Sequence, residues 1–175
     1  MHKVDPIKDI KMIKELENYV RYKSLAYYFI FKIGINAPLK AEELVQLTVS
    51  AVKSPVFLEI NGYQILLSEE LMTELDDYIA NYQLTSEDCL FCSKRTARPY
   101  TRQQLHRVLA EAADTLSLDC HIGVQSLKKT FAYHAYQQGM EIADLQHLLG
   151  HQSKKMTFNF IDVPPQAAAS IQLNL

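Results

Sequence analysis

Apolar positions recur at helical spacing through most of this chain. The first apolar stripe predicts an amphipathic helix that opens at Asp5-Pro6. Its members are Ile10, Ile13, Leu16 and Val20. Residues 25–35, LAYYFIFKIGI, are apolar nearly all round, which predicts a buried central helix. A third helix is expected within residues 36–47, NAPLKAEELVQL, where Pro38 suits a first helical turn.

The period of the pattern changes after this helix. VFLEI (56–60) and YQILL (63–67) flank Asn61-Gly62, and Asn-Gly is the strongest two-residue signal for a tight hairpin turn. The sequence therefore predicts one β-hairpin among the helices.

Capping residues and helix breakers delimit the later helices. Ser68 is suited to cap a helix over 69–82, and Thr101 with Gln104 has the spacing of a capping box. Gly139 and Gly150 each end a helical segment. The fold class that follows is α+β, mostly helical, with a small antiparallel β-hairpin sheet. No linker or repeat interrupts the pattern, so residues 1–175 are expected to form a single domain.

Composition excludes few classes of protein. The chain has 175 residues, 48% of them hydrophobic, and a formal net charge of −2, which argues against coating nucleic acid through bulk charge. Its longest apolar run, 25–31, is too short to span a bilayer, and the N-terminus has no apolar leader. We therefore expect a cytoplasmic protein without a membrane partner.

The cysteines raise one alternative. Cys89, Cys92, Cys120 and His121 superficially resemble a zinc-ligand set, but adjacent ligands such as the last two are awkward in a tetrahedral structural site. Ordinary reduced thiols are the preferred interpretation, so no metal and no cofactor are expected.

Three blocks of the sequence carry a family resemblance. They are FKIGINAPLKAEELVQLTVSAV (31–52), IGVQSLKKTFAYHAYQQGMEIADLQHLLGHQS (122–153) and KKMTFNFIDV (154–163). The first resembles the block around the first arginine of tyrosine recombinases of the phage-integrase type. The second is similar to their His-x-x-Arg block, and the third to their tyrosine helix. The resemblance implies an integrase-like catalytic domain, and because it covers nearly the whole chain, no separate N-terminal DNA-clamping domain is expected.

The active positions of the family are mostly replaced in this chain. The first arginine falls on Lys40, the histidine of His-x-x-Arg on Gln125 and its arginine on Lys128. The second histidine is kept as His151, and the nucleophilic tyrosine falls on Phe160. The family's hairpin lysine has no counterpart in 56–67.

These replacements remove the chemistry that the resemblance implies. In the family, a tyrosine oxygen attacks a DNA phosphodiester while two arginines hold the phosphate oxygens and a histidine and a lysine move protons. Phe160 has no oxygen to attack with. Lysine keeps the charge but not the two-pronged guanidinium, so phosphate contact stays possible. The sequence therefore favours a catalytically degenerate homologue that binds DNA or regulates recombination or integration of a phage or mobile element.

Two other interpretations stay open. In one, the chain is a diverged recombinase that retains slow strand cleavage through Tyr100, Tyr133 or Tyr136, although such tyrosines are more often packed with the hydroxyl at a rim. Alternatively, the fold serves as a protein-interaction module. Family members exchange a C-terminal segment between protomers, so residues 164–175 are a candidate for self-association. His151 can equally be a capping residue at a helix end.

Charge distribution supports double-stranded DNA as the partner. Residues 69–77 hold five acidic and no basic residues, whereas 94–129 is rich in basic ones, so one face could meet phosphate. Solvated surface charge is the alternative. The predicted DNA contacts are Lys40, Lys94, Arg95, Arg98, Arg102, Lys128, Lys129 and His151.

Overall fold

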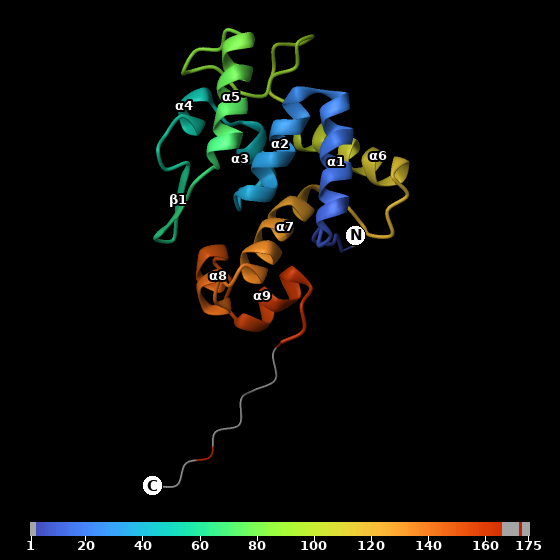
Figure 1. The fold of residues 1–175 in the computed structure, drawn as a ribbon, viewed down its shortest axis with the longest axis vertical. Coiled ribbons are helices and arrows are strands. Elements are labelled where there is room, and N and C mark those ends of the chain that lie inside the picture. The colour runs from blue at the N-terminus through green and yellow to red at the C-terminus, as the bar shows by residue number, and fades with distance from the viewer. Residues whose placement is uncertain (1–2, 166–171, 173–175) are drawn as a thin grey trace.

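Helices make up most of the described chain, which comprises residues 3–165 and 172 of a computed structural model (Figure 1). The helices are α1 Ile10–Lys23, α2 Leu25–Asn36, α3 Ala41–Val45, α4 Val49–Val52, α5 Glu69–Asn81, α6 Arg102–Thr115, α7 Val124–Gln137, α8 Ile142–Leu149 and α9 Lys154–Ile161. The strands are β1 Leu58–Ile60 and β2 Tyr63–Ile65. The predicted mostly helical α+β fold with one small sheet is confirmed.

The first helix starts later than predicted. Asp9 caps α1 by accepting a hydrogen bond from the Lys11 N–H, and residues 3–8 are not helical. This N-terminal strap, residues 3–9, is bonded across the chain. The Asp5 N–H donates to the His121 carbonyl at 2.8 Å, and the Ile7 N–H donates to Thr130 Oγ1 on α7 at 2.8 Å. These long-range bonds hold Asp5-Pro6 outside the helix.

The predicted central helix α2 is buried, and Ser24 caps it by accepting from the Tyr27 N–H. Gly34 lies where α2 meets α3 and α7. A methyl group built there would come within 2.8 Å of Leu127 Cδ1 and 3.0 Å of Leu44 Cδ2. The glycine therefore permits a close helix approach that a larger residue would obstruct. The third helix is shorter than expected, beginning at Ala41.

The hairpin forms as predicted. Leu58 pairs with Ile65 and Ile60 with Tyr63 in antiparallel register. Asn61 and Gly62 turn the chain with φ of 50° and 82°, the left-handed backbone that an Asn-Gly turn needs. Asn61 Nδ2 also donates to the carbonyls of His147 at 2.9 Å and Leu148 at 3.2 Å. The hairpin is thereby fastened to the C-terminal end of α8.

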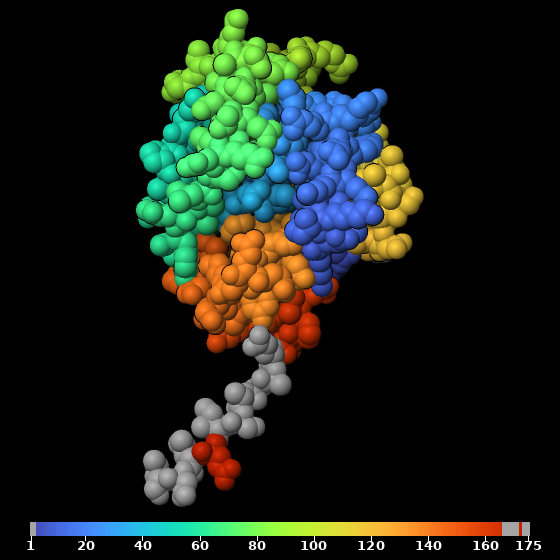
Figure 2. Space-filling view, in the orientation of Figure 1, coloured from blue at the N-terminus to red at the C-terminus, as the bar shows by residue number. Residues whose placement is uncertain are grey.

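Helix α7 joins two hydrophobic clusters. Its first half contributes Val124 and Leu127 to the larger cluster around α1, α2, α5 and α6. Its second half contributes Ala132 to a smaller cluster with Leu148 and Phe158 of α8 and α9. Figure 1 shows α7 running between these two groups of helices. In the space-filling view, α5 and the nearby loops form one end of the molecule and α7–α9 the other (Figure 2).

Predicted helix boundaries at the other elements also hold. Ser68 accepts from the Leu71 N–H, and Thr101 and Gln104 form the reciprocal capping box of α6. None of the helices in the described ranges is long and apolar enough to cross a membrane. The segment predicted for self-association, 164–175, lies outside the described residues except for positions 164, 165 and 172.

Candidate functional site

The short helix α3 carries the first residue of the site. The Lys40 N–H donates to Glu43 Oε2 at 2.9 Å, and the Leu44 N–H donates to the Lys40 carbonyl at 2.9 Å. This turn fixes the backbone of Lys40 while its side chain is left exposed. Apolar Leu44 faces inward and anchors the turn to the core.

Two more residues come from the start of α7. Gly123 precedes the helix, and its N–H donates to Ser126 Oγ at 3.0 Å. Gln125 is exposed in the first turn, and Lys128 lies one turn further on the same side. Lys128 is half-buried. Burial lowers its pKa, Lys40 lowers it further and Glu43 raises it, so the two lysines share one electrostatic environment.

The last two residues follow a left-handed turn. Gly150 ends α8 with φ of 68°, as predicted, and His151 comes directly after it. His151 Nδ1 is hydrogen-bonded to Thr157 Oγ1 at 3.0 Å, and its ring meets the Phe160 ring edge-on at 5.1 Å between centroids. Burial lowers the pKa of His151, and the positive charge of Lys128 lowers it further. The imidazole is therefore held toward its neutral form.

A cavity of about 370 Å³ joins these elements. Its lining residues are Leu39, Lys40, Ala41, Glu42, Arg102, Val124, Gln125, Lys128 and Phe160. Four of the five family positions line it directly, and the fifth, His151, packs against Phe160 outside the lining. We call this cavity the lysine pocket. The structure thus gathers residues that the sequence spreads over 120 positions, from 40 to 160.

The hairpin supplies no charge to the lysine pocket. At its tip, Asn61 is bonded to α8 carbonyls, and the Tyr63 hydroxyl donates to Asp144 Oδ1 at 2.8 Å. Both side chains serve to dock the hairpin on α8. Neither side chain carries the positive charge of the family's hairpin lysine.

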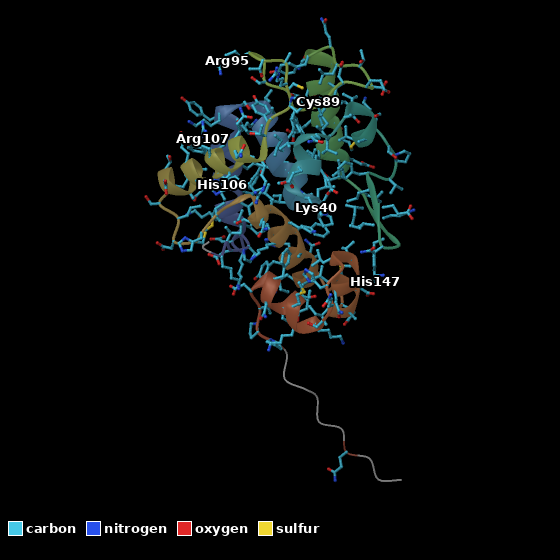
Figure 3. All side chains as sticks on the ribbon, turned by 180° about the vertical axis from the view of Figure 1, so that it is seen from behind. Lys40, Cys89, Arg95, His106, Arg107 and His147 are labelled. Atoms are coloured by element: carbon cyan, nitrogen blue, oxygen red, sulfur yellow. The ribbon has the colours of Figure 1, made fainter. Side chains whose placement is uncertain are left out.

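The exposed loop of residues 94–98, here called the basic loop, holds three of the predicted DNA contacts and lies apart from the lysine pocket. Ser93 and Arg98 are joined by a backbone hydrogen bond at 2.9 Å, so residues 94–97 form an exposed tip. Lys94 lies over the Tyr82 ring at 4.7 Å. Figure 3 shows Arg95 at one end of the molecule, His147 toward the other, and Lys40 between them. Lys94, Arg95 and Arg98 could therefore meet a ligand only at a distance from the pocket, whereas Arg102 lines it.

Lys129 differs from the other predicted DNA contacts. It is 6% exposed, and its ammonium group donates to the Val4 carbonyl at 2.9 Å beneath the N-terminal strap. It also lies 5.4 Å from the centroid of the Phe160 ring. Burial is the main reason that its pKa is lowered. In this structure Lys129 ties the strap to α7, and its role as a phosphate contact stays a prediction.

The alternative nucleophiles do not enter the lysine pocket. Tyr100 stacks on Tyr27 at 4.6 Å and lines a separate cavity beside the basic loop. Tyr136 packs edge-on against Phe158 at 6.0 Å, and Tyr133 lies beneath the Lys8 ammonium at 5.4 Å. All three tyrosines are thus packed against other groups, outside the lining of the pocket.

The cysteines do not assemble into the superficial zinc set. Cys89 and Cys92 are neighbours, and burial together with the Cys89 thiol raises the pKa of Cys92 to about 11. Cys120 lies against Met12 Sδ at 3.5 Å. Within residues 3–165, no group of three or more histidine, cysteine or acidic side chains is arranged to hold a metal ion.

Sequence reasoning missed one charged residue of the lysine pocket. Glu42 lines it, and its Oε1 lies 3.5 Å from Arg102 Nε. The run Lys40-Ala41-Glu42-Glu43 contains the signal, because it places two acidic residues close to the lysine, and the structure leaves both glutamates exposed. What the sequence could not show is that α6 brings Arg102 to this point.

Comparison with known structures gives the same fold. The crystal structure of the XerA recombinase aligns with a TM-score of 0.69 at 19% identity, over 92% of this chain and 60% of that one. XerH site-specific recombinase bound to its palindromic difH substrate aligns with a TM-score of 0.68 at 18% identity, over 91% and 49%. This chain therefore spans about half to three fifths of those proteins.

Sequence comparison is more specific. The probable integrase/recombinase YoeC of Bacillus subtilis (strain 168) is 35% identical over 169 residues, which cover 93% of this chain and 92% of YoeC. The family described as the Phage integrase family matches residues 9–166. With the fold, the gathered positions and these matches in agreement, the chain belongs to the phage integrase family.

Proposed function

We propose that this protein binds duplex DNA by its phosphates and does not cut it. The carrying observation is Phe160, whose ring lines the lysine pocket at the position that the family resemblance gives to the nucleophile. A phenyl ring has no oxygen with which to form a covalent link to phosphorus. The pocket can therefore hold a phosphodiester but cannot start the transesterification.

The other family positions in and beside the pocket support binding over catalysis. Lys40 and Lys128 provide positive charge for phosphate oxygens, but each is a point charge without the planar fork that suits a crowded transition state. Gln125 can form hydrogen bonds but does not exchange a proton near neutral pH. His151 is held toward its neutral form by burial and by Lys128. Ground-state contact with phosphate needs none of the lost proton transfers.

The basic loop adds a second contact at a distance from the pocket. Lys94, Arg95 and Arg98 are exposed, and none of them forms an ion pair within the described residues. Phosphates repeat along a duplex, so a second group of cations on the same molecule can engage the same backbone. The expected role is in DNA recombination or integration, as a binding or regulatory protein without strand cleavage.

A salt titration tests the proposal. Binding of a fluorescent duplex is followed by anisotropy between roughly 50 and 200 mM salt, and Kd values of about 1 µM or weaker are expected. Replacing Arg95, Arg98 and Arg102 with glutamine should flatten the plot of log K against log salt by about 0.9 for each arginine that meets a phosphate. The double variant Lys40→Gln with Lys128→Gln should also weaken DNA binding.

A matched control removes the same charge elsewhere. Lys11→Gln with Lys14→Gln, on exposed positions of α1, takes away two positive charges outside the pocket and the loop. This variant should keep most of the affinity. No binding at low salt would contradict the proposal, and so would tight binding with a Kd that does not change with salt concentration.

A further inference from the structure

Arg102 occupies an unusual position in the site, because it lines two neighbouring cavities. One is the lysine pocket, and the other, of about 460 Å³, is lined also by Lys3, His106 and Lys129. Val124 and Gln125 are shared by both. Arg102 therefore lies where two cavities with lysine in their lining adjoin.

The backbone of Arg102 is fixed while its guanidinium is not. Thr101 and Gln104 form a capping box at 2.8 and 3.2 Å, which sets the first turn of α6. The side chain is 55% exposed, and its Nε lies 3.5 Å from Glu42 Oε1. Within residues 3–165, the guanidinium makes this ion pair and no hydrogen bond. Its two terminal nitrogens are available to another anion.

The contact with Glu42 is weak by its geometry. It uses one nitrogen at long range, and the Glu42 side chain is 63% exposed, whereas strong arginine pairs are bidentate and shorter. Exposed pairs of this kind contribute little to stability. A phosphate that accepts two parallel N–H bonds from the same guanidinium is the better partner.

We infer that the Arg102 guanidinium binds a DNA phosphate at this site and that Glu42 pairs with this guanidinium in the DNA-free protein. The inference rests on the proposed DNA binding. Lys40 stands at the first-arginine position but offers a point charge, and Arg102 brings the planar fork to the same pocket from a different helix. Glu42 competes with the DNA phosphate for the Arg102 guanidinium, because the ion pair must break before the guanidinium can bind a phosphate. Duplex binding is thus restrained by the chain's own carboxylate.

The direct consequence is that removing an acidic side chain should tighten DNA binding through one arginine. Glu42→Gln should lower the Kd for a fluorescent duplex at low salt by about three- to tenfold, since it removes both the competitor and a repulsive charge. Glu15→Gln is the matched control. Glu15 lies on α1 in a loose pair with Lys11 at 4.0 Å, and it does not line the pocket. This control should change the Kd by less than about twofold.

A double-mutant cycle separates competition from general charge. Arg102→Gln should raise the Kd by about tenfold, and Arg102→Lys should recover only part of the loss because a lysine cannot form the fork. In the Arg102→Gln background, Glu42→Gln should have less than half of its effect on log Kd. Circular dichroism and thermal melting of each variant show that the fold is intact, since both residues are exposed.

The outcomes are distinct. An equal effect of Glu42→Gln in both backgrounds would mean that Glu42 acts by general charge alone, which overturns the inference while DNA binding stands. An Arg102→Gln variant with the same Kd as the unmodified protein would also overturn the inference. No binding by any variant at low salt would defeat the proposed function itself, and the inference with it.

Discussion

Gly34 links the packing of the core to the geometry of the lysine pocket. Gly34→Ala adds a methyl group that would meet Leu127 Cδ1 at 2.8 Å, Leu44 Cδ2 at 3.0 Å and Leu127 Cβ at 3.2 Å. Contacts between carbons are comfortable at about 3.5 to 4.0 Å. Both leucines are nearly fully buried, so neither can swing into solvent. Helices α3 and α7 must therefore move away from α2, or the leucines must take poorer rotamers.

The expected magnitude follows from two opposing effects. Overpacking a tight core costs about 1 to 3 kcal/mol. Alanine is favoured over glycine inside a helix by about 1 kcal/mol. The net loss in the free energy of unfolding should be about 1 kcal/mol, and for a domain of this size that lowers the Tm by roughly 2 to 4 °C. Urea unfolding followed by circular dichroism measures it, with the m value unchanged.

The displacement of α3 and α7 should also change the geometry of the lysine pocket. Leu127 precedes Lys128, and Leu44 lies one turn after Lys40, so separating the helices separates the two lysines. DNA affinity should therefore fall while the protein stays folded. In a Leu127→Ala background, the contact with Cδ1 is gone while those with Leu44 Cδ2 and the Cβ of residue 127 remain, so Gly34→Ala should cost less than in the unchanged protein. If Gly34→Ala stabilised the otherwise unchanged protein by about 1 kcal/mol, helix propensity alone would explain it and the close approach would not matter.

Two further outcomes are expected. The lowered pKa of His151 means that the unfolded chain takes up a proton more readily than the folded one as the pH falls below the ordinary value of 6.5. Stability should thus decline on acidification through that range, and His151→Asn should reduce the slope of unfolding free energy against pH measured in urea; an unchanged slope would contradict the burial of the imidazole. At the hairpin tip, Asn61→Gly keeps the left-handed turn but loses two hydrogen bonds to α8, so it should cost about 1 kcal/mol, and Asn61→Ala should cost more because φ is 50°. Equal costs in the urea assay would show that the turn conformation is not a constraint.

Local signals in the sequence predicted much of this fold. The Thr101–Gln104 capping box, the Asn61-Gly62 turn and the helix end at Gly150 each depend on neighbouring residues, and each forms as predicted. The start of α1 could not be predicted in this way. Asp5-Pro6 has the local chemistry of a helix start, but hydrogen bonds to residues more than 100 positions away hold this segment outside the helix.

The site was predictable only in part for the same reason. Lys128 and Lys129 are adjacent and chemically identical, so the sequence cannot tell which one faces the pocket. Their directions on α7 differ by about 100°, and the N-terminal strap covers Lys129. The partnership of Arg102 with Glu42 likewise depends on how α6 packs near α3. Chemistry-bearing residues can be found from the sequence, but their exposure and partners depend on contacts that are distant along the chain.

The most direct measurement is a search for a covalent protein–DNA adduct. The unmodified protein and Phe160→Tyr are incubated with a pool of labelled, nicked duplexes of random sequence and resolved on a denaturing gel. Neither should give an adduct. Restoring one hydroxyl leaves Lys40, Gln125 and Lys128 in place of the family's arginines and histidine, and catalytic groups that act as a unit recover little when one returns. Each missing electrostatic donor can lower the rate by about a hundredfold or more. An adduct with Phe160→Tyr would show that the remaining pocket is still competent, and an adduct with the unmodified protein would contradict binding without cleavage.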